Sequence, residues 1–316
     1  MTNFKIESSG SDRSAEKRDY NLVEFENQPV KPLKDSDIPD ALDFEIMASG
    51  GQATVVSAAP IAQRVSDSYQ SEAELEAEFI QQLQRQAYEY LQIESEQDLI
   101  SNLRKQLELL NNITFTDSEW KRFFKTSIAS ETDGIVEKTR RIQEDYIQTL
   151  KRDDGSSKNI WLIDKNNIHN NRLQVINQYA VQGTYENRYD VTILVNGLPL
   201  VHVELKRRGV PLIEAFNQIE RYQRDSFWSG SGLYEYVQIF VISNGTHTKY
   251  YSNTTRMGHL KEAQNSGNGS RKKTSNSFEF TMWWAAADNK PITELIPFTS
   301  TFFAKHSLLN LSLIHI

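Results

Sequence analysis

The segment YDVTILVNGLPLVHVELKRRG, residues 189–209, constrains the fold more than any other part of the chain. Two apolar runs surround an Asn-Gly dipeptide, which is typical of a tight turn between antiparallel strands. Charged residues interrupt this pattern, because Asp190, Glu204 and Lys206 lie within runs that are otherwise rich in Val, Ile and Leu. Burying unpaired charge costs free energy, so the fold must provide partners for these three side chains.

The register of the hairpin decides whether the two acids meet. Side chains alternate between the two faces of a strand, so Glu204 and Lys206 share one face. A two-residue loop would place Asp190 opposite Val203, whereas a three-residue loop at 196–198 would place Asp190 opposite Glu204, about 5 Å away at Cβ. We predict the three-residue loop, because only that register brings two carboxylates and a lysine together.

Two converging carboxylates raise each other's pKa unless a cation lies between them. A hard divalent cation, Mg²⁺ or Mn²⁺, fits because it takes oxygen ligands and keeps water and substrate phosphate as further ligands. We therefore predict that Asp190 and Glu204 bind a metal, and that Lys206 orients or deprotonates a water or holds a scissile phosphate. The alternative is an edge strand protected by charge, with Glu204 and Lys206 facing solvent.

A helix predicted at 71–91 offers a third carboxylate. Apolar residues recur at helical spacing after a capping-box pair, Ser71 and Glu74. Glu72 and Glu76 fall within the apolar stripe, and Glu76 lies near its centre. An inward-facing Glu needs a cation or a donor, so we predict Glu76 as the third metal ligand. Glu72 is the alternative ligand, and a solvated helix end is the other explanation for Glu76.

The helix predicted at 211–225 supplies further polar candidates. Gln218 and Tyr222 are four residues apart and therefore lie on one side of this helix. Beside the hairpin they would bind a phosphate or hydrogen-bond to the lysine. The alternative is that both are ordinary residues at the boundary of the apolar face of the helix, without a role in a site. Arginines around this region are candidates for contacts with flanking phosphates, or else solvated surface residues: Arg207, Arg208, Arg221 and Arg224.

The remaining pattern predicts an α/β protein with a mixed sheet flanked by helices. Residues 1–70 are polar and are interpreted as a flexible or partly ordered leader. Further helices are expected at 97–110, 134–150 and 291–309, and strands at 158–164, 172–181, 236–243, 247–252 and 278–286.

Composition excludes several classes of protein. The 316 residues are 38% hydrophobic, which suffices for a core, and the absence of cysteine excludes disulfides and cysteine metal sites. The sequence has no secretory signal and no run of roughly 18 apolar residues, so we expect a cytoplasmic protein without a membrane partner. The net charge of -7 counts against a broad nucleic-acid-binding surface but allows a local basic rim.

The order Asp190, Glu204-x-Lys206, Gln218-x-x-x-Tyr222 resembles the RecB-like branch of the PD-(D/E)xK nucleases, with their QxxxY motif. The resemblance extends to the N-terminal nuclease region of the restriction subunit of type I restriction enzymes, over roughly 70–306. It is carried by SEAELEAEFIQQL, DSEWKRFF, DGIVEKTR, NRYDVTILVNGLPLVHVELKRRG, EAFNQIERY, FVISNGTHTKYYSNTT and FEFTMWWA. It implies a restriction-endonuclease-like fold at 71–306, metal ligation by Asp190 and Glu204, catalysis by Lys206, and support from Gln218 and Tyr222.

In that family a helicase motor follows the nuclease domain, and the subunit joins methylase and specificity subunits. This chain carries no motor motif, so ATP use and translocation are implied only for a parent subunit. We interpret residues 307–316 as a truncated or foreign tail. We expect a Mg²⁺-dependent endonuclease domain that acts on double-stranded DNA. One alternative is a docking module that is inactive alone and cuts only within the assembled complex, and another is a sheet protein without chemistry.

Overall fold

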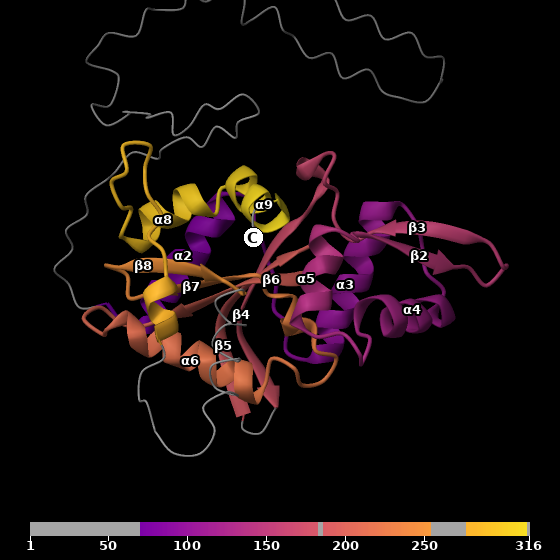
Figure 1. Cartoon of the computed structure of the whole chain (residues 1–316), viewed down its shortest axis with the longest axis horizontal. Helices are drawn as coiled ribbons and strands as arrows, with labels where there is room; N and C mark the ends of the chain where they lie inside the picture. The colour runs from indigo at the N-terminus through magenta and orange to yellow at the C-terminus, as the bar shows by residue number, and fades with distance from the viewer. Residues whose placement is uncertain (1–69, 183–185, 254–275, 315–316) are drawn as a thin grey trace, which may run out of the picture. The chain divides into compact units, whose positions relative to one another are not determined.

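A six-stranded mixed sheet forms the centre of the computed structural model, which describes residues 70–182, 186–253 and 276–314. The strand order is β1-β4-β5-β6-β7-β8, and the β1/β4 and β6/β7 pairs are parallel (Figure 1). The predicted α/β class, a mixed sheet flanked by helices, is confirmed. The strands are β1 (Glu89–Tyr90), β4 (Leu173–Gln182), β5 (Glu186–Val195), β6 (Leu198–Leu205), β7 (Ile239–Ser243) and β8 (Thr248–Ser252).

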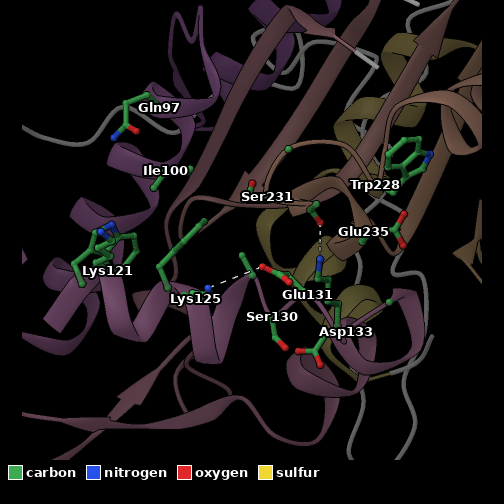
Figure 2. Close-up of a pocket in the computed structure, with 17 residues that line it drawn as sticks. Gln97, Ile100, Lys121, Lys125, Ser130, Glu131, Asp133, Trp228, Ser231 and Glu235 are labelled. Atoms are coloured by element: carbon green, nitrogen blue, oxygen red, sulfur yellow. Dashed lines mark hydrogen bonds and ion pairs between the residues drawn. The ribbon is translucent and has the colours of Figure 1, made fainter. Parts of the chain in front are cut away.

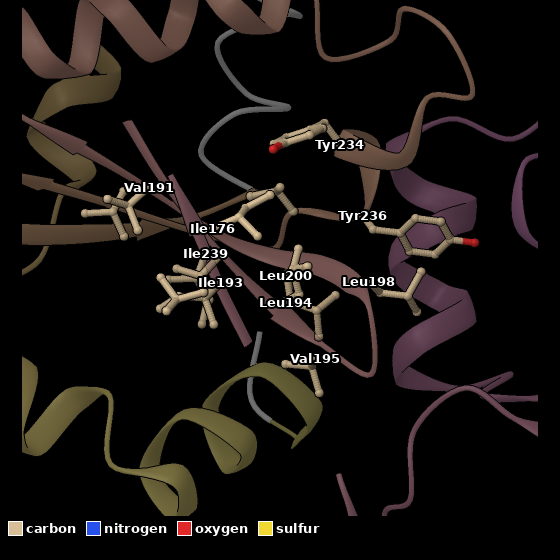
Figure 3. Packing of buried hydrophobic residues seen from close by; sticks show 14 of the residues in the cluster. Ile176, Val191, Ile193, Leu194, Val195, Leu198, Leu200, Tyr234, Tyr236 and Ile239 are labelled. Carbon is tan, nitrogen blue, oxygen red and sulfur yellow. The ribbon is translucent and has the colours of Figure 1, made fainter. Parts of the chain in front are cut away.

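Helices cover both faces of the sheet. Helix α6 (Leu212–Asp225) lies on one face, and α2 (Glu72–Arg85), α8 (Leu295–Phe302) and α9 (Lys305–Ile314) lie on the other (Figure 1). All eight residues of β6 are buried, because both of its faces are covered. Buried apolar side chains of the central strands pack into one continuous core (Figure 3).

A second group of elements lies beside the sheet (Figure 1). Its two-stranded sheet pairs β2 with β3 in antiparallel register. The elements are α3 (Glu96–Asn111), α4 (Asp117–Phe123), a π-helical turn (Phe124–Ile128), α5 (Ile135–Gln143), β2 (Ile147–Lys151) and β3 (Ser157–Trp161). None of the helices in the described ranges is long and apolar enough to cross a membrane.

Helix α2 begins where the sequence predicts. The Ser71 side chain accepts a hydrogen bond from the Glu74 backbone N–H, and the Glu74 carboxylate accepts one from the Ser71 backbone N–H. This capping box satisfies two of the donors that a helix start leaves unpaired. The same arrangement, with Ser95 and Thr116 as caps, begins α3 and α4.

Three predicted helices are shorter than expected. The helix predicted at 71–91 ends at Arg85, and residues 89–90 form β1. In the two others, tertiary packing interrupts the helical pattern. The helix predicted at 134–150 ends at Gln143, and residues 147–151 form β2, where Leu150 is buried against the core. The helix predicted at 291–309 is divided into α8 and α9. The break lets Phe302 and Phe303 pack edge to face with each other while Leu308 also reaches the core. In both places tertiary burial outweighs the local helical pattern.

The strand predicted at 278–286 is wrong. The segment starts as a 3₁₀ turn (Asn276–Phe280) and then makes only isolated bridges, one of them between Tyr250 and Met282. Phe278 packs on Phe216 of α6, whereas Trp284 packs on Phe302 of α8, on the opposite face of the sheet. The segment therefore wraps around the β8 edge, and an extended strand could not place both rings.

The expected leader at 1–70 lies outside the described residues except for Gln70. Of the residues interpreted as a tail, 307–314 belong to α9, and the side chains of Leu308 and Leu309 are fully buried.

The turn between β5 and β6 has two residues, which corrects the predicted three-residue loop. Asn196 and Gly197 both have positive φ, at 51° and 83°, as a tight hairpin turn of this kind requires. The Asn196 side chain fixes the turn, because it donates to Leu162 O at 3.0 Å and accepts from the Arg172 N–H at 2.8 Å.

The predicted register of Asp190 is nevertheless reached. Val195 pairs with Leu198 and Leu194 with Pro199, but Ile193 then pairs with Val201, so one extra residue bulges from β6. The bulge follows a proline, which has no N–H to contribute to the ladder. Beyond the bulge the register places Asp190 next to Glu204, as the three-residue loop would have done.

Gly197→Ala is expected to destabilise the fold by about 2–5 kcal/mol. A Cβ at Gly197 would lie 2.6 Å from Leu103 Cα, so overpacking adds to the strain of a positive φ. Gly209→Ala is the matched control, because Gly209 has φ of 86° and open space around it. Urea unfolding should give the control a loss of only about 1–2 kcal/mol, and equal losses for both variants would contradict the prediction.

Candidate active site

A break in side-chain alternation positions Asp190. Tyr189 and Thr192 are three residues apart, yet both contact Tyr234 on the α6 face, through a ring distance of 4.6 Å and a hydroxyl pair at 3.1 Å. Regular alternation would send them to opposite faces. The register places Gln178 of β4 opposite Asp190, and Gln178 has a positive φ of 52°. The alternation of side chains between the two faces of the sheet is therefore interrupted in both strands, at Gln178 in β4 and at Asp190 in β5.

Asp190, Glu204 and Lys206 come together where β6 ends. The Asp190 carboxylate accepts a hydrogen bond from the Leu205 N–H at 2.9 Å. The Lys206 ammonium lies 2.9 Å from Glu204 Oε1 and donates to Leu205 O at 3.0 Å. Glu204 is fully buried, and its other oxygen, Oε2, makes no hydrogen bond. The end of β6 thus holds two acids, one cation and one unused carboxylate oxygen.

Burial and neighbouring charged groups control the charge of this cluster. Burial raises the pKa of Asp190, and the neighbouring Glu204 charge raises it further. Burial likewise raises the pKa of Glu204, and the Lys206 charge and the neighbouring Asp190 carboxyl group offset only part of that effect. Burial alone would lower the pKa of Lys206, but the charge of Glu204 leaves that pKa raised. The two acids therefore lack full charge compensation from the protein.

His202 does not supply the missing positive charge. Burial lowers the pKa of this residue to about 4, so the ring is neutral near pH 7. Its Nε2 lies 3.6 Å from Glu204 Oε2, and neither ring nitrogen makes a hydrogen bond. The rings of Tyr189, Tyr222 and Phe227 surround it edge to face.

Gln218 and Tyr222 lie on α6, on the sheet face that also carries Glu204. The Tyr222 hydroxyl accepts a hydrogen bond from Gln218 Nε2 at 2.5 Å and donates to Arg188 O at 2.8 Å. Tyr222 is buried, and the charges of Glu204 and Asp190 add to burial in raising its pKa. The pair thus joins α6 to β5 two residues before Asp190.

The two candidate acids of α2, Glu72 and Glu76, have different surroundings. Both oxygens of Glu76 are occupied, by Asn177 Nδ2 at 2.6 Å and Gln178 Nε2 at 2.5 Å. Glu72 is exposed and accepts a hydrogen bond from the Arg207 N–H at 3.2 Å. The charge of Glu72 raises the pKa of Glu204 and also contributes to the raised pKa of Lys206. The α2 acid associated with the cluster is therefore Glu72, one helical turn before the predicted Glu76.

The four candidate arginines lie on the loop after β6 and on α6, and they have different contacts. Arg207 contributes its backbone N–H to Glu72, and Arg208 bonds to Gln70 and Thr246. The Arg221 guanidinium lies 5.6 Å from the centre of the Tyr222 ring. Arg224 pairs with its neighbour Asp225 at 3.4 Å. Arg207, Arg221 and Arg224 are exposed.

The donor set fits a divalent cation that is completed by substrate. Within the described residues, no three His, Cys, Asp or Glu side chains are gathered closely enough to hold a metal ion by themselves. Mg²⁺ is commonly bound by one or two carboxylates together with waters and substrate phosphate. Asp190 and the unused Oε2 of Glu204 offer such a pair, and their raised pKa values show that positive charge would be favourable there.

A pocket of about 800 Å³ lies elsewhere, between the π-helical turn, α5 and the loop before β7 (Figure 2). Neither Asp190, Glu204 nor Lys206 lines it. Its charged groups include Lys125 and Glu131, which face each other at 4.0 Å (Figure 2). This cavity is therefore separate from the site at the end of β6, where the two acids lie.

The fold is restriction-endonuclease-like, with its six-stranded mixed sheet flanked by helices. The chain belongs to the family described as type I restriction enzyme R protein N terminus, whose family model matches residues 69–259. That match contains every candidate site residue named above, from Glu72 on α2 to Arg224 on α6.

Relatives support the same family. The chain is 50% identical over 248 residues to the type I restriction enzyme EcoprrI endonuclease subunit of Escherichia coli, covering 78% of this chain and 74% of that protein. It is 39% identical over 239 residues to the SsaAORF53P endonuclease subunit of Staphylococcus saprophyticus. That alignment covers 74% of this chain but only 23% of the staphylococcal protein. A putative subunit of Methanocaldococcus jannaschii is 30% identical over 180 residues, or 53% of this chain and 17% of that protein.

The structure adds residues that the sequence pattern does not reveal. Gln178 interrupts the strands at Asp190, and Asn177 joins it in holding Glu76. The only sequence signal for Glu72 is its position one turn before Glu76 on the same stripe, which makes both acids candidates.

Proposed function

We propose that this chain is a Mg²⁺- or Mn²⁺-dependent endonuclease domain that hydrolyses phosphodiester bonds in double-stranded DNA. The observation that carries the proposal is the convergence of Asp190, Glu204 and Lys206 at the end of β6, in a chain of the type I restriction enzyme family. A bound divalent cation would offset the charge of the scissile phosphate and lower the pKa of a water molecule.

Asp190 and Glu204 are the proposed metal ligands. Glu72, in place of Glu76, is proposed as a third carboxylate that approaches only when metal and substrate are bound, because the three acids are not gathered around one point in this structure. Glu204 Oε2 is the atom without a hydrogen bond, and the backbone N–H of Leu205 orients Asp190. Glu76 is the weaker candidate, since both of its oxygens already accept hydrogen bonds.

Lys206 is proposed to act on the reacting phosphate or water. Its ammonium lies beside Glu204 and stays charged near neutral pH, because that carboxylate raises its pKa. A positive group there would stabilise the charge that develops as water attacks phosphorus and the bond to the leaving oxygen breaks. Gln218 and Tyr222 would keep α6 and β5 in place around it.

The arginines are proposed contacts for flanking DNA phosphates. Arg207, Arg221 and Arg224 are exposed on the loop after β6 and on α6, and Arg208 is partly buried. Such contacts would position the duplex without reading its sequence. Recognition of a DNA site would then belong to a specificity subunit, methylation to a methylase subunit, and ATP-driven translocation to further domains of a parent subunit.

A second candidate function is a docking module that is inactive alone. The net charge of -7 favours it, because this charge opposes long-range attraction to DNA. In this version the same acids cut only when partner subunits hold DNA against them.

Plasmid cleavage by the purified chain separates the two candidates. With Mg²⁺ or Mn²⁺ and no partner subunits, robust cutting that stops on addition of a chelator would reject the docking-only function. If only the assembled restriction enzyme cuts, the docking function is favoured. No cutting by either preparation, with either metal, would refute the endonuclease proposal.

A further inference from the structure

Lys249 of the edge strand β8 lies in the same row of the sheet as Glu204. Glu204 pairs with Ile242 of β7, and Ile242 pairs with Lys249. Directly paired residues project to the same face, so Lys249 shares the face of the acid pair. Two strand spacings of about 4.8 Å put its Cα about 10 Å from that of Glu204.

Ring contacts identify that face independently. The preceding row runs His202, Phe240 and Tyr251, and Tyr251 packs on Phe216 of α6 at 5.0 Å. Lys249 is two residues from Tyr251 and therefore also belongs to the α6 face. This row lies at the edge where β6 and β7 end and β8 begins, and this edge also carries the acid pair.

Within the described part of the chain, a hydroxyl group and two aromatic rings hold the ammonium of Lys249 in place. It donates to Thr281 Oγ1 at 3.1 Å, and that hydroxyl in turn donates to Phe278 O. It lies over the rings of Phe278 and Trp283, 5.3 Å and 5.0 Å from their centres. Among the described residues no Asp or Glu lies within ion-pair distance of it, and burial alone lowers its pKa.

Aromatic and apolar side chains next to Lys249 are open to solvent. Trp283 is 38% exposed, Met282 46% and Phe280 64%. They belong to the segment that wraps around the β8 edge, bridged to Tyr250 through Met282. A cation positioned among exposed aromatic rings is the combination that nucleic-acid surfaces use for phosphate contact and base or sugar packing.

We infer that Lys249, supported by Thr281 and Trp283, is a DNA-positioning residue that holds a backbone phosphate beside the scissile one. The inference rests on the proposed endonuclease function, which it extends to a residue two strands away from the acids. The Cα spacing of about 10 Å along the row is short enough for the Lys249 side chain to reach a phosphate next to the one held at the acid pair.

The test measures how DNA affinity depends on salt. The 316-residue chain and its Lys249→Gln variant are titrated with a fluorescent duplex in chelator, between about 50 and 200 mM KCl. Loss of one phosphate contact should lower the slope of log affinity against log salt by about 0.9. Gln keeps a donor for Thr281, so the fold is retained, and Lys249→Arg should keep the full slope because it keeps the charge.

Lys158→Gln is the matched control, because Lys158 is exposed on β3 of the separate two-stranded sheet and should leave the slope unchanged. An unchanged slope for Lys249→Gln, or no DNA binding by the wild-type chain, would overturn the inference. A variant that binds DNA normally but associates less with a partner subunit would make this edge a protein-docking surface and would also overturn it. Plasmid cleavage is scored separately, so cutting by the wild type with no effect at Lys249 refutes only this inference.

Discussion

Asp190→Asn is expected to lower DNA cleavage by more than about 100-fold while leaving the fold intact or more stable. The asparagine oxygen can still accept from the Leu205 N–H, but the amide is a poor ligand for a hard cation. Burial and the charge of Glu204 both oppose ionisation of Asp190. Without metal, removing that charge should therefore raise the free energy of unfolding by about 0.5–2 kcal/mol. Plasmid cleavage by the assembled enzyme and urea unfolding of the chain measure the two effects.

Lys206→Met serves as the second test of the same cluster. It should lower cleavage by about 10²–10³-fold, since it removes the cation beside the reacting phosphate. Unlike Asp190→Asn it should also destabilise the chain, because Glu204 would lose its ion pair at 2.9 Å while remaining buried. Double-strand cleavage retained by both variants would contradict the proposed mechanism. Equal changes in the free energy of unfolding would contradict the different charge environments assigned to Asp190 and Lys206.

Exchanging the two α2 acids for glutamine should separate metal binding from stability. Glu72→Gln is expected to weaken Mn²⁺ affinity by about 10–100-fold with little change in stability, since Glu72 is exposed. Glu76→Gln is expected to leave Mn²⁺ affinity nearly unchanged but to cost about 1–3 kcal/mol. Asn177 and Gln178 both donate to the native carboxylate. In the variant, the NH₂ group of the new glutamine would face one of these two donors, so one hydrogen bond would be lost.

Calorimetric Mn²⁺ titration with a bound duplex and urea unfolding would be carried out on both variants. Each variant is the control for the other, because both make the same chemical change on the same helix, one turn apart. Weaker Mn²⁺ binding by Glu76→Gln but not by Glu72→Gln would restore Glu76 as the third ligand.

The order of most helices and strands along the chain follows from local sequence patterns. The capping box at Ser71, the helix at 212–225 and the central strands are visible as helical or alternating periodicities. The segment at 278–286, which wraps around the β8 edge, is predicted as a strand because it is rich in aromatic residues, which favour strands. Its conformation depends instead on Phe278 and Trp284 packing on opposite faces of the sheet.

The sequence alone determined that Asp190, Glu204 and Lys206 are charges placed within apolar strands, and that a shared register would bring the acids together. The tertiary structure decided how that register arises, through a two-residue turn fixed by Asn196 and a bulge after Pro199. It also favoured Glu72 over Glu76, because periodicity specifies a helix face but not which turn of α2 approaches the end of β6. That distance depends on how the helix packs on the sheet, which is a property of the whole core and not of the helix.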